Sequence, residues 1–178
     1  MATIFSHAIV AGLIPKFSKL CSKRLVIICI LCSILPDLDV LAFKLGIAYS
    51  HPLGHRGFTH SIIFALISCA WLRFLFFKDY SAPQKRMIFI LLFLSMMSHG
   101  VLDAFTNGGL GVGFFIPFDN TRYFFPTRPI QVSPIGMNFF SYGGVLTLLS
   151  EFKFIVLPVG GLLVAKLIYR KLAIKINK

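Results

Sequence analysis

The chain has 178 residues, of which 57% are hydrophobic and only 13% are charged, and its mean hydropathy is +0.83. A soluble domain of this length would carry about a quarter charged residues, so the composition excludes an ordinary soluble protein and indicates an integral membrane protein. The formal net charge of +12 does not indicate a nucleic-acid partner, because the basic residues cluster beside apolar runs and no nucleic-acid-reading motif accompanies them.

The apolar runs predict the architecture. A membrane-spanning helix needs about 20 apolar residues, and four runs approach that length: Leu25 to about Leu45, Ser61 to Phe77, Met87 to Phe105, and a run within Gly143 to Tyr169 whose start is obscured by Glu151 and Lys153. The run from Ala2 to Ile14 is shorter and predicts a half-helix or an interfacial helix. We expect an all-α, membrane-embedded helical bundle of about four spans plus a short N-terminal helix, in a single domain over residues 1–178.

The basic clusters predict how these spans cross the membrane. They fill loops 15–24 and 78–86 and the tail 170–178, and the positive-inside rule places all three in the cytoplasm. Four spans then leave loop 46–60 and segment 106–140 on the outer side. These two segments carry most of the glycines and prolines that favour turns, so the expected topology is consistent with the loop composition.

Three polar segments interrupt the apolar pattern: Leu-Pro-Asp-Leu-Asp at 35–39, His-Arg-Gly-Phe-Thr-His-Ser at 55–61 and Ser-His-Gly-Val-Leu-Asp at 98–103. Asp37 lies 13 residues after Arg24, and His99 lies 13 residues after Arg86. At about 1.5 Å per residue, both would lie roughly 20 Å from the cytoplasmic face, and His60 begins the returning second span. Ionisable groups are costly at such a depth, so the three segments predict one functional cluster in the outer half of the membrane.

Two of these segments carry aspartates in patterns that suit a metal ion. His99 and Asp103 are four residues apart on a predicted helix and therefore share a face, as two ligands or as a structural hydrogen-bonded pair. Asp37 and Asp39 follow Pro36, which would break the first span and free backbone groups to line a polar cavity. Their oxygens can bind divalent cations, or one of them can cap the helix after the break.

The segment 55–61 places two histidines on either side of Gly57, which permits a tight turn. His55 and His60 could therefore face one point. Arg56 between them suits a phosphate or carboxylate, or marks a charge at the membrane surface. Ser61 is expected to cap the next helix, and His51 to be an exposed loop histidine.

Two features outside these segments have ordinary packing explanations. His7 stands alone in an apolar run, and it could reach the cluster if the N-terminal helix were tilted with its start outward. Cys29 and Cys32 form a C-x-x-C, but no second pair at zinc-finger spacing completes it. We expect them to pack as small hydrophobic residues.

In their order and spacing over about residues 7–137, His7 and the three polar segments resemble the YdjM-like family of LexA-regulated, inner-membrane metal-dependent hydrolases. That family is grouped with the zinc-dependent phospholipase C and P1-type nucleases, which bind zinc through an N-terminal amine, histidines and aspartates and cleave phosphoesters. The resemblance implies a bacterial inner-membrane location, a supporting or bridging role for Asp39, and Arg122 near the mouth of the site. It implies these metal ligands: His7, Asp37, His55, His60, His99 and Asp103.

The resulting hypothesis is a membrane-bound, metal-dependent hydrolase acting on a phosphoester, such as a lipid-linked one, at the outer face. Asp39 would take a proton as general base, and Arg56 and Arg122 would hold substrate phosphate. Zinc is the favoured ion, with manganese and magnesium as alternatives. The chain starts Met1-Ala2 with no processed amine, so one or two ions are expected rather than three.

Two alternatives remain open at the level of sequence. The first is a non-catalytic metal-binding or ion-transport protein, because intramembrane aspartates and histidines also mark ion paths. The gathering of the polar residues at one depth argues against a path across the bilayer. The second is a purely structural polar core. Membrane lipids are the expected partners, no nucleic acid is expected, and the oligomeric state is not predicted.

Overall fold

The computed structural model describes residues 1–176 and is all-helical. Among these residues there is no strand, and two isolated β-bridges join Thr106 to Ile130 and Val112 to Tyr123. Residues 177–178 of the basic tail lie outside the described residues. The predicted all-α class is confirmed. The α-helices are α1 (Ile4–Leu13), α2 (Lys23–Ile34), α3 (Leu41–Lys44), α4 (Ile62–Phe76), α5 (Ala82–Ala104), α6 (Tyr142–Glu151) and α7 (Leu157–Ile176).

Three helical stretches of the described chain are long and apolar enough to cross a membrane. Lys23–Lys44 runs from α2 through the 3-10 helix η2 (Leu35–Val40) into α3, Ala82–Ala104 is α5, and Tyr142–Ala173 joins α6 to α7 through the π-helical turn η5 (Phe152–Val156). Ile4–Phe17 and Ile62–Phe76 are shorter apolar helices. The expected helical bundle with a short N-terminal helix is therefore present, but the predicted second span is the 15-residue helix α4, which is shorter than the helices that could cross a membrane.

Local sequence signals decide where the helices that carry the polar segments begin and end. The α-helical part of α2 ends at Ile34, and the chain passes through Pro36 as η2, because proline lacks the N–H that an α-helix needs. Ser61 caps α4, since its side chain accepts a hydrogen bond from the amide of Phe64. The predicted break at Pro36 and the predicted cap at Ser61 are both confirmed.

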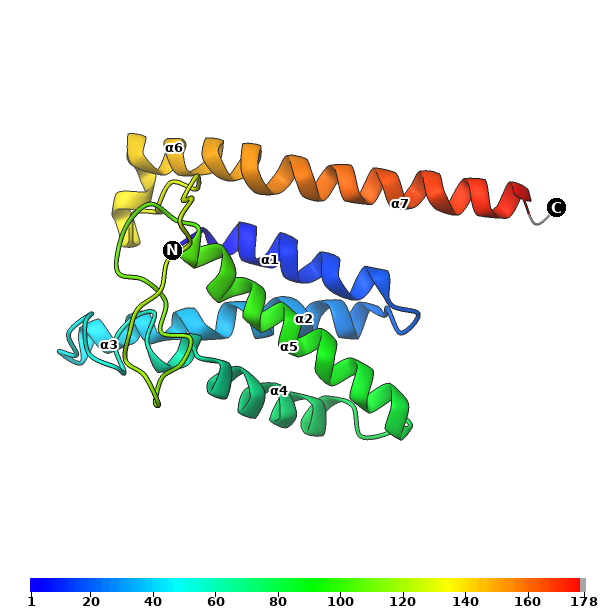
Figure 1. The fold of residues 1–178 in the computed structure, drawn as a ribbon, viewed down its shortest axis with the longest axis horizontal. Helices are drawn as coiled ribbons and strands as arrows, with labels where there is room; N and C mark the ends of the chain where they lie inside the picture. The colour runs from blue at the N-terminus through cyan, green and yellow to red at the C-terminus, as the bar shows by residue number, and fades with distance from the viewer. Residues whose placement is uncertain (177–178) are drawn as a thin grey trace.

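The core of the bundle lies between α1, α2, α4 and α5, with α5 in contact with the other three (Figure 1). Leu25, Leu92 and Met96 are buried there. Cys32 and Cys69 lie in the same core with their sulfur atoms 3.6 Å apart, which agrees with the expected role of small apolar side chains. Many of the other apolar side chains face outward, as expected where lipid surrounds the helices.

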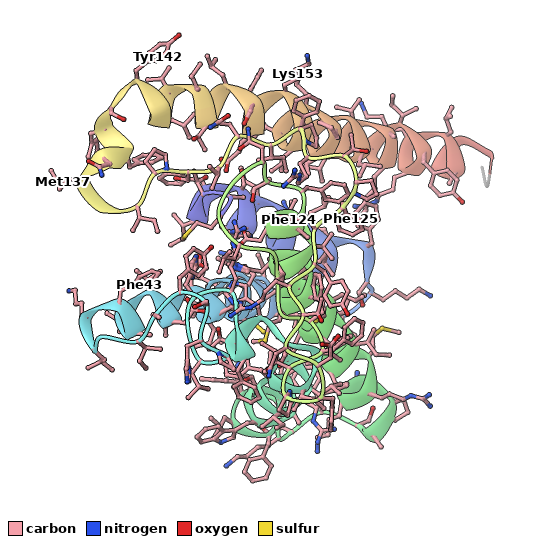
Figure 2. The ribbon with its side chains drawn as sticks, turned by 60° about the vertical axis from the view of Figure 1, so that its left-hand side comes forward. Phe43, Phe124, Phe125, Met137, Tyr142 and Lys153 are labelled. Atoms are coloured by element: carbon pink, nitrogen blue, oxygen red, sulfur yellow. The ribbon has the colours of Figure 1, made fainter. Side chains whose placement is uncertain are left out.

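The two ends of the bundle differ in character. Segment 105–135 winds over the end that also holds the N-terminus and α3 (Figure 1). Met137 and Tyr142, at the turn into α6, project away from this end (Figure 2). The α1–α2 turn, the α4–α5 turn and the far part of α7 gather at the opposite end (Figure 1). The polar segments therefore lie at one end of the molecule and the basic loops at the other.

Candidate metal centre

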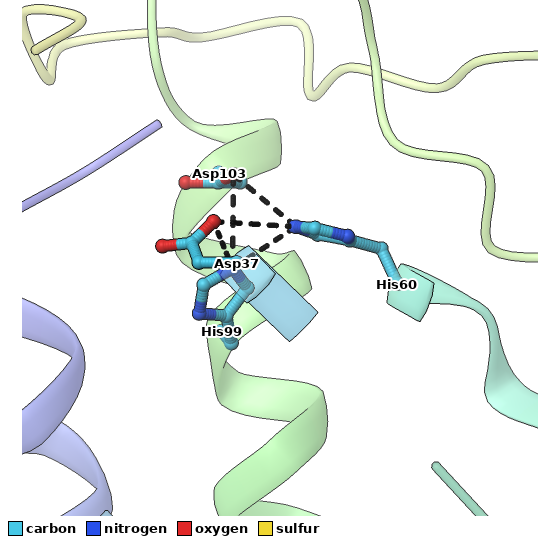
Figure 3. A group of neighbouring side chains, drawn as sticks. All are labelled: Asp37, His60, His99 and Asp103. Carbon is cyan, nitrogen blue, oxygen red and sulfur yellow. Dashed lines mark hydrogen bonds and ion pairs between the residues drawn. The ribbon is translucent and has the colours of Figure 1, made fainter. Parts of the chain in front are cut away.

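The three polar segments, which are far apart in the sequence, meet at one point. Asp37 from η2, His60 from the 3-10 helix η3 (Phe58–His60), and His99 and Asp103 from the end of α5 form a group. Their ligand atoms all lie within 4.8 Å of one another (Figure 3). The break after α2 and the cap of α4 aim Asp37 and His60 at the α5 face that carries His99 and Asp103. The group could hold a metal ion.

The distances within this group match side chains arranged around a common centre. The two Nε2 atoms of His60 and His99 are 3.0 Å apart. Asp37 Oδ1 lies 3.3 Å from His99 Nε2 and 3.8 Å from His60 Nε2. Asp103 Oδ2 lies 3.8 Å from His60 Nε2 and 3.9 Å from His99 Nε2. Two nitrogens and two carboxylate oxygens therefore face one small volume, and a mixed nitrogen and oxygen donor set of this kind binds zinc or similar ions.

Burial makes this arrangement costly without a further partner. His99 and Asp103 are fully buried, and the side chain of Asp37 is 11% exposed. Asp37 Oδ1, Asp103 Oδ2, His99 Nδ1 and both ring nitrogens of His7 are buried without a hydrogen-bond partner among the described residues. Buried polar atoms are normally paired, and leaving them unpaired costs free energy. A cation bound between the carboxylates and imidazoles would satisfy part of this set.

The structure also brings His7 to the group, because α1 starts at the same end of the bundle. The His7 ring is fully buried and stacks on His99 with ring centroids 3.7 Å apart. Its Nε2 lies 3.5 Å from Asp103 Oδ1. His7 therefore reaches the cluster, which the sequence left open, because α1 starts at the end of the bundle that carries the group.

The start of α1 is held by two carboxylates. The Ala2 amide donates to Asp103 Oδ1 at 2.7 Å. The Thr3 amide and hydroxyl each donate to an oxygen of Glu151, both at 2.5 Å. Glu151 is 2% exposed and directly precedes η5. The role of Glu151 was not predicted from the sequence, although a carboxylate within an apolar run is a signal that could have revealed it.

Glu151→Gln is expected to lower the stability of the protein by about 1–3 kcal/mol, because an amide NH₂ would face the Thr3 donors and leave a buried donor without an acceptor. Thermal unfolding in detergent measures the effect. Lys153→Gln is the matched control, since Lys153 is exposed and projects outward from the neighbouring turn (Figure 2). Equal unfolding temperatures for the two variants would contradict the anchoring role.

A second group, formed by Asp39, His55 and His60, lies beside the first. Asp39 accepts from Thr59 Oγ1 at 2.5 Å and from the Arg56 amide at 3.1 Å. Its oxygens also lie 2.6 Å from His55 Nδ1 and 3.2 Å from His60 Nδ1. His60 thus turns Nδ1 to a carboxylate and Nε2 to the first group, an arrangement typical of metal-bound histidines. Burial lowers the pKa of His60, which favours the neutral ring that a metal requires.

Arg56 is buried inside the protein and not at the membrane surface. Its φ of 61° turns the side chain inward. There Nε lies 3.0 Å from Asp103 Oδ2, and Nη2 donates to Thr106 Oγ1 at 2.9 Å. Nη1 donates to the carbonyls of Gly108 and Leu110, at 3.1 and 2.8 Å. Contact with a substrate phosphate, as predicted for Arg56, would require one of these bonds to open.

Arg122 is half-buried in segment 106–140. Its guanidinium donates to the carbonyls of His51 and His55, at 2.9 and 3.2 Å. It therefore joins segment 106–140 to the loop that carries His55 and Arg56. His51 is exposed, as expected, and belongs to neither His/Asp group.

The sequence is similar to a known family of membrane proteins. A family model described as "YdjM inner membrane protein" matches residues 1–173. The chain belongs to this family. It is also 37% identical over 175 residues to the inner membrane protein YbcI of Escherichia coli (strain K12), which covers 96% of this chain and 99% of that protein. No solved structure matches the chain.

Membership of the YdjM family confirms the resemblance on which the sequence analysis relied. This YdjM-family member is an inner membrane protein with membrane-spanning helices. The segments that carried the resemblance are also the segments that converge in the structure. Of the six residues predicted as metal ligands, four form the first group, His55 belongs to the second, and His7 contacts the first group through Asp103.

Proposed function

We propose that this protein is a membrane-bound, metal-dependent hydrolase that cleaves a phosphoester at the outer face of the inner membrane. The observation that carries the proposal is the buried group of two carboxylates and two imidazoles, in which Asp37 Oδ1 has no hydrogen-bond partner. The donor set fits zinc, and manganese or magnesium are the alternatives. Asp37, His60, His99 and Asp103 would hold the ion.

A bound divalent cation would supply Lewis acidity and lower the pKa of water to about 7. The protein's own residues set the conditions for this chemistry. Asp39 orients His60, and Ala2 holds one oxygen of Asp103 while the other faces the group. Asp39, predicted as the general base, has both oxygens occupied by neighbouring donors. Asp37 is the partly exposed carboxylate of the group, so it is better placed to accept a proton from an incoming water.

The surroundings of the group favour a lipid-linked phosphoester as the substrate. Arg122 offers a cation for a phosphate if its hydrogen bonds to the carbonyls of Tyr49, His51 and His55 open. A cavity of about 460 Å³ lies beside Ala2, whose amide bonds Asp103. Hydrocarbon chains fit a groove with such a lining. The apolar residues that line it include Met1, Phe5, Val40, Pro134, Phe139 and Phe140.

The proposed topology places the basic loops in the cytoplasm and the metal centre toward the outer side. It is supported by the basic turns and the metal centre lying at opposite ends of the bundle (Figure 1) and by the positive-inside rule. In this topology a substrate would reach the centre from the outer leaflet.

Cys21 provides a direct test of this topology, because it is exposed in the α1–α2 turn while Cys29, Cys32 and Cys69 are buried. A membrane-impermeant maleimide is expected to label the protein in inside-out vesicles and not in intact spheroplasts. A Cys21→Ser, Thr127→Cys variant, with its cysteine in the exposed outer segment, should show the opposite pattern. Labelling of Cys21 in intact spheroplasts would reverse the topology.

The proposed activity is tested on protein purified in detergent. Metal content is measured first, and hydrolysis is then assayed on an aryl phosphodiester and on a phospholipid in mixed micelles. We expect bound zinc or manganese and hydrolysis that a chelator abolishes and added metal restores. Protein that binds no divalent metal and hydrolyses neither substrate would overturn the proposal. Metal flux into proteoliposomes, without hydrolysis, would favour transport instead.

A further inference from the structure

The two His/Asp groups share His60 but differ in how their carboxylate oxygens are used. In the first group, Asp37 Oδ1 is buried without a hydrogen-bond partner, and Asp103 Oδ2 is paired with Arg56 Nε at 3.0 Å. In the second group, both oxygens of Asp39 are occupied, Oδ1 by His55 and Oδ2 by the Arg56 amide and the Thr59 hydroxyl. The first group therefore has a free carboxylate acceptor in Asp37, whereas a cation in the second group would have to displace hydrogen bonds that both oxygens of Asp39 already make.

The second group also serves the first through its geometry. Asp39 lies 3.2 Å from His60 Nδ1, and His60 Nε2 faces Asp37 and Asp103 in the first group (Figure 3). The same carboxylate holds His55 through Nδ1 at 2.6 Å. Asp39 thus positions His55 directly, and it positions His60 together with the Thr59 hydroxyl, which lies 3.1 Å from His60 Nδ1 and donates to Asp39. This is the role of a residue that supports a metal ligand and is not a ligand itself.

The sum of the buried charges also indicates that only the first group binds a metal ion. Asp37, Asp39 and Asp103 are three carboxylates around the centre, and Arg56 is a guanidinium with its Nε 3.0 Å from Asp103 Oδ2. With neutral histidines these four groups carry a net charge of −2, which one divalent ion cancels. A second divalent ion would leave an uncompensated positive charge in a buried site, which is costly. Glu151 is a further buried carboxylate, and its charge is balanced by the N-terminal amino group of Met1, which interacts with both Glu151 and Asp103.

We propose that the centre holds one divalent ion, bound by Asp37, His60, His99 and Asp103, and that Arg56 is the fixed cation that takes the place of a second metal. The guanidinium is suited to this role because it is fully buried and its Nε lies 3.0 Å from Asp103 Oδ2. His55 and Asp39 then position His60 and do not bind metal. This inference rests on the proposed metal centre and specifies its stoichiometry.

The test counts metal ions in full-length protein saturated with Zn²⁺ in detergent and freed of excess metal. Elemental analysis is expected to give one zinc per chain. X-ray absorption at the zinc edge is expected to show nitrogen and oxygen neighbours and no second zinc at roughly 3.5–4 Å, the usual separation in two-metal sites. His55→Ala is expected to keep about one equivalent, and His99→Ala to lose it. Asp37→Asn, at the exposed edge of the group, provides a second ligand variant if His99→Ala does not fold.

The outcomes separate the two proposals. Two zinc ions per chain, with a zinc–zinc signal and the loss of one ion in His55→Ala, would overturn the single-ion inference while leaving a metal-dependent function standing. Loss of all zinc in His55→Ala, from a variant that still elutes and unfolds like wild type, would also overturn it by making His55 a ligand. Absence of zinc from the wild-type protein would overturn the metal centre itself.

Discussion

His99→Ala is expected to lower metal affinity more than 100-fold and to reduce hydrolysis to the background rate. His99 Nε2 lies 3.0 Å from His60 Nε2 and 3.3 Å from Asp37 Oδ1, so its removal opens the centre of the first group. Loss of a residue that only supports a ligand costs about 10–100-fold, and loss of a ligand should exceed that. Metal titration followed by elemental analysis measures the affinity, and the phosphodiester assay measures the rate.

A graded series makes this expectation specific to the metal centre. Asp39→Asn keeps the shape of the side chain but weakens its hold on His55 and His60, so we expect a loss within the range of about 10–100-fold. His51→Ala should match wild type, since His51 is exposed and belongs to neither group. Equal losses for His99→Ala and His51→Ala would show that the assay does not report on this site.

The sequence predicted the features that depend on local pattern. The lengths of the apolar runs predicted the helices. Pro36 predicted the break after α2, and Ser61 predicted the N-terminal cap of α4. The number of residues between each basic loop and the following polar segment predicted a similar depth for the polar segments, and therefore predicted that they converge. A four-residue spacing on one helix also gave the shared face of His99 and Asp103. Each of these inferences needs only the helical rise, the helical period and the cost of burying charge.

The features that the sequence did not reveal depend on contacts between distant segments. Thr3 and Glu151 are 148 residues apart, and nothing in either local pattern indicates the other. The inward turn of Arg56 depends on its positive φ and on carbonyls supplied by segment 106–110. The proposed roles of Asp37 as a metal ligand and Asp39 as a support for His60 likewise depend on which hydrogen-bond donors surround each carboxylate. Periodicity assigns a side chain to a face, but only packing decides which partner it meets.

Arg56→Ala is expected to destabilise the protein by about 3–5 kcal/mol, the usual cost of removing one partner of a buried ion pair. The substitution leaves Asp103 without its nearest cation, and it leaves Thr106 and the carbonyls of Gly108 and Leu110 without a donor. Thermal and denaturant unfolding in detergent, followed by circular dichroism, would measure the loss.

Arg56→Lys separates the charge of this side chain from its shape. A lysine keeps the positive charge near Asp103, but its single ammonium group cannot reproduce a planar fork of donors. We therefore expect it to recover part of the stability lost in Arg56→Ala.

Added Zn²⁺ should stabilise both variants, because a ligand that binds only the folded state raises its stability. The stabilisation should be larger in Arg56→Ala, where the bound ion is the main cation left to balance Asp103. A variant that unfolds like wild type without metal would show that the buried guanidinium does not stabilise the centre.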